Sequence, residues 1–190
     1  MFRIAVFASG SGSNAEALVR HFAENPYGRV KRIFTNNLNA GVIERGKRLN
    51  VPVTVFNPKE DNDKILEELK RDADIILLAG YLKLIPLSWA DSFEGRMLNI
   101  HPALLPKHGG KGMYGSNVHK AVAAAGDTES GITIHFVSPE YDKGTVLAQY
   151  AVELEKTDGP EEIEQKVREL ELEYYASTVE AYLENLALQG

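Results

Sequence analysis

Short, almost wholly apolar segments recur along this chain and alternate, in its first half, with segments of helical periodicity. Residues 75–79, Ile-Ile-Leu-Leu-Ala, contain no polar side chain, which is typical of a strand covered on both faces. This alternation predicts an α/β, Rossmann-like fold with a mostly parallel central sheet and helices on both faces. The expected strands are residues 3–8, 30–35, 51–56, 74–79, 96–100, 132–137 and 146–152.

The last two expected strands are separated by residues 138–145, which contain Pro139 and Gly144 and favour an ordered loop over a helix. After Gly159, a proline and two glutamates predict the start of a long terminal helix. We expect this helix to pack on the sheet and to carry no chemistry. Its expected apolar stripe is Ile163, Val167, Leu170, Tyr174, Val179, Tyr182 and Leu186.

The length of 190 residues predicts one domain, residues 1–190, without metal-binding thiolates or disulfides, because the chain has no cysteine. Its net charge of −6, with no basic block, argues against nucleic acid as a partner. A small anion can still bind where the local potential is positive. Residues 1–8 lack a basic leader and are too short to span a membrane, so they predict a buried first strand.

An amide and an imidazole lie two residues apart at the end of the strand expected at residues 96–100. Residues 99–106 read Asn-Ile-His-Pro-Ala-Leu-Leu-Pro, and side chains two apart in a strand share a face. Asn99 and His101 can together hold a developing oxyanion and move a proton. Spacing alone leaves a second interpretation equally open, in which both residues only satisfy backbone groups of the turn.

A glycine-rich loop, residues 9–14 with the sequence Ser-Gly-Ser-Gly-Ser-Asn, follows the first expected strand and opens a helix. Glycine lets the backbone approach a ligand closely. The N–H groups of Gly12, Ser13 and Asn14 would point from the helix N-terminus toward an anion such as a phosphate. The alternative is that Ser13 or Asn14 only caps the helix.

The same loop fits a loose dinucleotide fingerprint, with Gly10, Gly12 and Ala15 at the required spacing. A dinucleotide-binding fold would also require an acid at the end of the second strand, where this chain has Asn36 and Asn37. A phosphate monoester is therefore favoured over a nicotinamide or flavin cofactor.

A second histidine and an acid follow in the last third of the chain. His135 lies in the alternating segment 131–137, and Asp142 lies in the turn-rich loop after it. If that loop folds over the end of the strand bearing His101, Asp142 can pair with the His101 ring and orient it. Asn99, His101, His135 and Asp142 would then form an acyl-transfer site without a serine or cysteine nucleophile. Each residue considered alone also has a purely structural interpretation: His135 as a hydrogen-bonded histidine in a strand, and Asp142 as a cap of the turn.

A zinc site is the other interpretation of these residues. It would use His101, His108, His135 and Asp142, but none of the compact ligand spacings of zinc sites is present, so we expect no metal. His21 and His119 fall in expected helices, where a surface or partly buried position is the simplest interpretation.

Three segments together resemble the phosphoribosylglycinamide formyltransferases, a family of folate-dependent enzymes of purine synthesis. They are residues 9–14, residues 99–106, and residues 131–137 with Asp142-Lys143-Gly144, and the resemblance spans nearly the whole chain. The second segment is also similar to methionyl-tRNA formyltransferases, sugar formyltransferases and formyltetrahydrofolate deformylases. The glycine loop and the short length favour the first family.

The resemblance implies transfer of a formyl group from 10-formyltetrahydrofolate, a co-substrate and not a tightly bound cofactor, to the amine of glycinamide ribonucleotide. It implies that Asn99 and His101 stabilise a tetrahedral intermediate while Asp142 assists proton transfer. The implied catalytic residues are Asn99, His101, Asp142 and His135, and the implied phosphate-binding residues are Gly12, Ser13 and Asn14. The implied folate-binding residues are Lys64, Leu82, Lys83, Leu84, Ile85 and Asn99.

One segment departs from the family pattern. After Pro106 the family commonly has an aromatic residue and one glycine, whereas residues 107–117 are longer here and rich in glycine. This difference predicts a mobile loop beside the site.

Two other functions stay open. One is a different folate-dependent formyltransferase or a deformylase, and the other is a catalytically silent nucleotide-binding module. The expected partners are small molecules, without nucleic acid or membrane, and the chain is expected to be a monomer or homodimer. The missing signal and the metabolic role together predict a cytoplasmic location.

Overall fold

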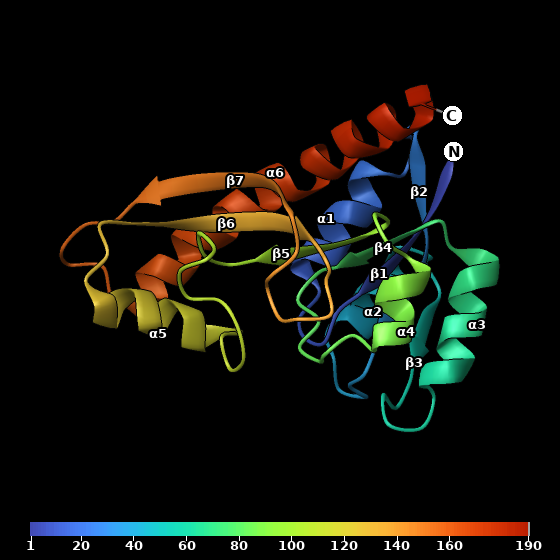
Figure 1. The fold of residues 1–190 in the computed structure, drawn as a ribbon, viewed down its shortest axis with the longest axis horizontal. Coiled ribbons are helices and arrows are strands. Elements are labelled where there is room, and N and C mark those ends of the chain that lie inside the picture. The colour runs from blue at the N-terminus through green and yellow to red at the C-terminus, as the bar shows by residue number, and fades with distance from the viewer. Residues whose placement is uncertain (190) are drawn as a thin grey trace.

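The computed structural model describes residues 1–189, which form a seven-stranded sheet of order β3-β2-β1-β4-β5-β6-β7 (Figure 1). Strands β1 to β5 are parallel to one another, whereas β6 is antiparallel to both β5 and β7. The mostly parallel α/β sheet predicted from the apolar segments is therefore confirmed. The strands are β1 (Phe2–Phe7), β2 (Gly28–Thr35), β3 (Val53–Val55), β4 (Ile75–Leu78), β5 (Met97–His101), β6 (Glu129–Phe136) and β7 (Val146–Glu153).

Helices cover both faces of this sheet. Successive strand residues point to opposite sides, so the apolar strands present a buried face to each layer of helices. Ile4 and Val6 of β1 belong to one core with α1, α2, α5 and α6, whereas Ala5 and Phe7 belong to a second core with α3 and α4. Figure 1 shows the long α6 running beside β6 and β7, away from α3 and α4. The helices are α1 (Ser13–His21), α2 (Val42–Arg48), α3 (Asn62–Asp72), α4 (Leu87–Ser92), α5 (Ser116–Ala125) and α6 (Pro160–Gln189).

The buried row of α6 differs from the expected stripe. Leu170, Tyr174, Tyr182 and Leu186 are only partly buried, whereas Tyr175 and Leu183 are fully buried. The deepest residues follow a strict spacing of four along the helix, a row that side chains of an α-helix form on its surface. Its apolar members are Ile163, Val167, Tyr175, Val179 and Leu183, and the position between Val167 and Tyr175 holds Glu171. The row therefore carries one carboxylate toward the sheet.

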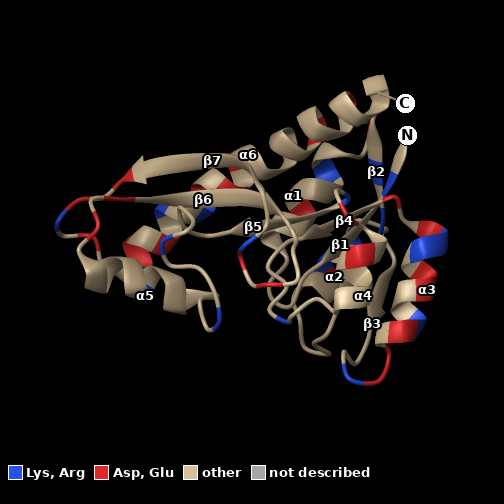
Figure 2. Cartoon of the chain, in the orientation of Figure 1, with Lys and Arg blue, Asp and Glu red and all other residues tan. Residues whose placement is uncertain are grey.

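Acidic and basic side chains are interspersed over the surface, as α3 shows in Figure 2. Within residues 1–189, no helix has the length and apolar character needed to cross a membrane.

A charge cluster fixes α1 against α2. The Glu16 carboxylate pairs with Arg20 and Arg48, each at 2.7 Å, and with Arg45. Hydrogen bonds from these arginines, that from Arg20 foremost, lower the pKa of Glu16 to about 2. Arg45 also donates from Nε to the carbonyl of Ser11 at 2.8 Å, so the cluster reaches the backbone of the glycine-rich loop.

We expect Glu16→Gln to lower the melting temperature near neutral pH by about 2–4 °C, the shift that ~1 kcal/mol produces in a domain of this size. The pKa of Glu16 falls from 4.5 to about 2 on folding, so its contribution is complete above pH 4.5 and is lost as the pH falls toward 2. Thermal unfolding across that pH range, followed by circular dichroism, should show the difference between variant and parent shrinking. Glu67→Gln, which removes only a pair with the half-exposed Lys70, is the control. A difference that does not change with pH would contradict the assignment.

Candidate active site

Two adjoining cavities lie beyond the carboxyl ends of β1, β4 and β5, the edge at which sheets of this kind bind ligands. The larger cavity has a volume of about 490 Å³ and the smaller one about 230 Å³. Gly80, Gly115 and Glu171 line both, so the two cavities form one continuous cleft.

Strand register places Asn99 beside His135. The two residues are directly opposite each other in the antiparallel pair β5–β6, and Asn99 Nδ2 lies 3.1 Å from His135 Nε2. His135 Nδ1 lies 2.9 Å from the carbonyl of Phe136, which can only accept, so Nδ1 carries the proton and Nε2 accepts from Asn99. Burial lowers the pKa of His135 and keeps this ring neutral. The Asn99 amide is thereby fixed, with its second N–H left for another partner.

His101 and Asp142 face each other at the same end of β5. His101 Nε2 lies 2.8 Å from the carbonyl of His108, which can only accept, so Nε2 carries a proton and Nδ1 is the nitrogen that faces Asp142. Nδ1 is 3.6 Å from Asp142 Oδ2, and Asp142 Oδ1 is 3.7 Å from His135 Nε2. Both distances exceed a normal hydrogen bond, so the carboxylate faces both rings without bonding to either.

The structure thus brings together the four residues predicted to be catalytic. Asp142 does more than cap a turn, because its Oδ2 accepts a hydrogen bond from the Gly110 N–H at 2.8 Å. Asn99, His101, His135 and Asp142 all line the larger cavity.

The glycine-rich loop lines the smaller cavity. Gly12 is the N-cap of α1 in a left-handed conformation, and no side chain caps the helix, so the capping interpretation of Ser13 and Asn14 is wrong. Asn14 instead donates from Nδ2 to Glu171 Oε2 at 2.9 Å. Burial raises the pKa of Glu171, and Arg168 adds a positive charge to the lining of the same cavity. The uncapped first turn and Arg168 suit an anion.

Asn36 and Asn37, at the end of β2, occupy the place where a dinucleotide fold would use an acid. The Ser9 hydroxyl donates to Asn36 Oδ1 at 2.6 Å and accepts from the N–H of Leu82 at 3.0 Å. Asn37 Nδ2 donates to the Ser9 carbonyl at 3.2 Å. The two asparagines therefore tie the first loop to the end of β2 and to the segment after β4, and no acid is available there for a ribose.

The segment predicted to contact folate, Leu82, Lys83, Leu84 and Ile85, lines the larger cavity. Core packing accounts for Ile85, which is buried, but not for Leu82 and Leu84, which remain 45% and 51% exposed. Tyr114 and Tyr141 line the same cavity and are also partly exposed. Lys64 is placed differently: it is exposed on α3 and lines neither cavity of the cleft.

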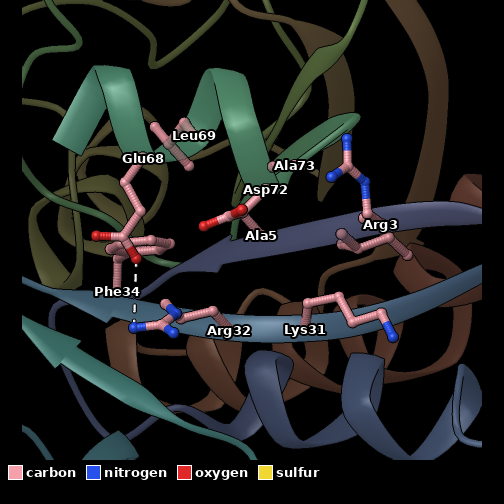
Figure 3. Close-up of a pocket in the computed structure, with 10 residues that line it drawn as sticks. Arg3, Ala5, Lys31, Arg32, Phe34, Glu68, Leu69, Asp72 and Ala73 are labelled. Carbon is pink, nitrogen blue, oxygen red and sulfur yellow. Dashed lines mark ion pairs between the residues drawn. The ribbon is translucent and has the colours of Figure 1, made fainter.

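A third cavity, of about 260 Å³, lies near the amino ends of β1 and β4, away from the cleft (Figure 3). Its two arginines already have carboxylate partners: Arg32 pairs with Glu68 at 3.3 Å, as the dashed line in Figure 3 marks, and Arg3 pairs with Asp74 at 2.8 Å. None of the predicted site residues lies there.

Sequence reasoning missed the contribution of α6, for which no chemistry was expected. The signal was present, since Glu171 is the charged member of an otherwise apolar row spaced by four residues. The loop predicted to be mobile contacts the site through His108 and Gly110, and within it the Met113 N–H donates to the Gly110 carbonyl at 3.0 Å; its mobility stays a prediction.

An amide, an imidazole and a carboxylate beside a glycine-rich loop on an α/β sheet suit an acyl-transfer enzyme, and the sequence matches one family of such enzymes. The formyl transferase family profile covers residues 2–179. The phosphoribosylglycinamide formyltransferase of Bacillus subtilis is 35% identical over 96% of this chain and 95% of its own length. The chain therefore belongs to the formyl transferase family, among the phosphoribosylglycinamide formyltransferases.

Other relatives agree with this assignment. The chloroplastic phosphoribosylglycinamide formyltransferase of Arabidopsis thaliana is 43% identical over 96% of this chain. The chain spans 65% of that relative's length and 61% of the corresponding protein of Vigna unguiculata. The crystal structure of glycinamide ribonucleotide transformylase 1 from Geobacillus kaustophilus superposes with a TM-score of 0.88 at 38% identity, covering 96% of this chain and 99% of that one.

Gly12→Ala is expected to lower the melting temperature by about 4–8 °C, the effect of ~2 kcal/mol in a domain of this size. Its φ is 80°, and an added Cβ would lie 2.5 Å from Val42 Cγ2 and 2.9 Å from Val42 Cα. Gly10→Ala is the matched control, because a Cβ there meets nothing within 4 Å. Differential scanning fluorimetry of both variants provides the measurement, and equal shifts would show that the left-handed turn at Gly12 is not needed.

Proposed function

We propose that this chain transfers the formyl group of 10-formyltetrahydrofolate to the amine of glycinamide ribonucleotide in purine biosynthesis, the activity named for its relatives. The observation that carries this proposal is the position of Asn99, His101 and Asp142. They line the larger, partly apolar cavity, which is continuous with the smaller cavity beside the glycine-rich loop. A phosphorylated amine and a ring-bearing formyl donor can therefore meet at these side chains.

The nucleotide fits the smaller cavity. Its phosphate accepts hydrogen bonds from the N–H groups of Gly12, Ser13 and Asn14, and Arg168 adds a positive charge. Glu171, which lines both cavities and is held by Asn14, accepts hydrogen bonds from the ribose hydroxyls. The glycinamide amine then extends toward the larger cavity.

The folate fits the larger cavity. The pterin ring lies against Leu82, Lys83, Leu84 and Ile85. The leucine side chains cover the ring, and backbone groups form hydrogen bonds with its polar edge. The formyl carbon is placed beside Asn99. Lys64 does not line this cavity, so its proposed contact with folate would involve only a part of the co-substrate that extends beyond it.

The chemistry needs one new bond and one broken bond. The amine nitrogen attacks the formyl carbon, and the carbonyl oxygen becomes an oxyanion that the free N–H of Asn99 stabilises. Protonated His101, its Nε2–H held by the His108 carbonyl, offers Nδ1–H as a second donor. Asp142 takes the proton that the attacking amine loses and returns it, directly or through water, to the folate nitrogen as the carbon–nitrogen bond breaks. His135 acts by holding the Asn99 amide.

The acceptor is tested by mixing the purified protein with 10-formyltetrahydrofolate and following the release of tetrahydrofolate. Release that requires glycinamide ribonucleotide supports the proposal. Release without the nucleotide would instead identify a deformylase. No release with or without it would favour a different acceptor or a silent binding module.

His101→Ala and Asp142→Asn are each expected to lower kcat by at least about 10²-fold, because each removes a group that acts on the intermediate. The KM values and the melting temperature should change little. Asp91→Asn, an exposed acid on α4 that does not line the cleft, is the control for handling and charge. Near-parental turnover of either variant would remove that residue from the chemistry, and a defect confined to KM would reassign it to binding.

A further inference from the structure

One short loop holds both His101 and Asp142 through its backbone. The carbonyl of His108 accepts a hydrogen bond from His101 Nε2 at 2.8 Å. The N–H of Gly110, two residues on, donates to Asp142 Oδ2 at 2.8 Å. The distance between the His101 ring and the Asp142 carboxylate is therefore set by the path of residues 108–110.

This path is supported by a side-chain pair outside the cleft. His108 Nε2 lies 2.6 Å from Asp127 Oδ2, in the turn between α5 and β6. Both side chains are largely buried, at 15% and 17% exposure. The hydrogen bond from His108 is the main cause that lowers the pKa of Asp127, and a second contribution comes from Lys107, at 3.2 Å. The pair therefore joins the loop to the turn that follows α5.

The backbone at His108 needs such support. Its φ is 53°, a left-handed conformation that costs a residue with a Cβ about 1–2 kcal/mol. An unsupported loop would relax toward a negative φ and turn the His108 carbonyl away from the His101 ring.

We propose that His108 and Asp127 act as a positioning pair for the reaction: they hold the His108 carbonyl on His101 Nε2 and so fix which ring nitrogen faces Asp142. Neither residue touches the reacting atoms. Because a carbonyl can only accept, this contact keeps the proton on Nε2 and leaves Nδ1 facing Asp142. The inference rests on the role proposed above for His101.

The pair is tested by long-range ¹H–¹⁵N NMR of histidine-labelled protein, which distinguishes the two neutral tautomers, with His101→Gln used to assign the signals. At alkaline pH the parent should show His101 protonated on Nε2 alone. In Asp127→Ala the ring should populate both tautomers, and kcat should fall about tenfold with KM values within about threefold.

Three further variants separate positioning from general damage. His108→Gly removes the ring at a residue type that accepts positive φ and should reproduce the defect of Asp127→Ala even if that variant folds poorly. His108→Asn tolerates the same φ, keeps a donor for Asp127 and should recover kcat to within about threefold of the parent. Lys107→Ala removes a side chain that is 69% exposed and should leave spectrum and turnover unchanged.

A single Nε2 tautomer with parental kcat in both Asp127→Ala and His108→Gly would overturn the positioning pair. A mixed tautomer with parental kcat would support the pair but overturn the catalytic role of His101. The two proposals therefore fail in different ways.

Discussion

The antiparallel pairing of β5 with β6 is the constraint on which the site depends. It sets Asn99 directly opposite His135, so that the amide and the ring meet at 3.1 Å although 36 residues separate them. The same pairing directs the loop after β6 back over the end of β5. Gly144 makes this return possible, because a Cβ there would lie 1.7 Å from the carbonyl oxygen of Phe136. Asp142 is carried to His101 by this close approach of two backbones.

The sheet and its layers could be predicted because they follow from periodicity. A fully apolar segment such as β4 has one interpretation in a chain of this length, and the rhythm of strands and helices fixes most of the order. Asn99 and His101 could be found as well, since a strand places both on one face. Whether Asp142 reaches them depends on the β5–β6 register and on a loop of irregular backbone, which no local pattern encodes.

Two other features were not predicted from the sequence, for different physical reasons. Glu171 was overlooked because the stripe on α6 was read with mixed spacings of three, four and five, whereas the buried row advances by four residues at every step. The loop at 107–117 was expected to be mobile from its glycines. It makes a tertiary contact, the pair of His108 with Asp127, and composition carries no information on such a contact.

The charge of the cleft is set by the groups that line it and not by the net charge of the chain. The chain has a net charge of −6, and three arginines near the glycine-rich loop are already paired with Glu16. In the proposed binding mode, backbone N–H groups and Arg168 are left to meet an anion there, because the loop and Arg168 line the same cavity. At the reacting groups the proton positions are set by the main chain. The carbonyl of Phe136 places the proton of His135 on Nδ1, and the carbonyl of His108 places that of His101 on Nε2. The His135 ring therefore accepts from Asn99, while the His101 ring turns Nδ1 to Asp142. The two histidines differ in this way because the two carbonyls face different ring nitrogens.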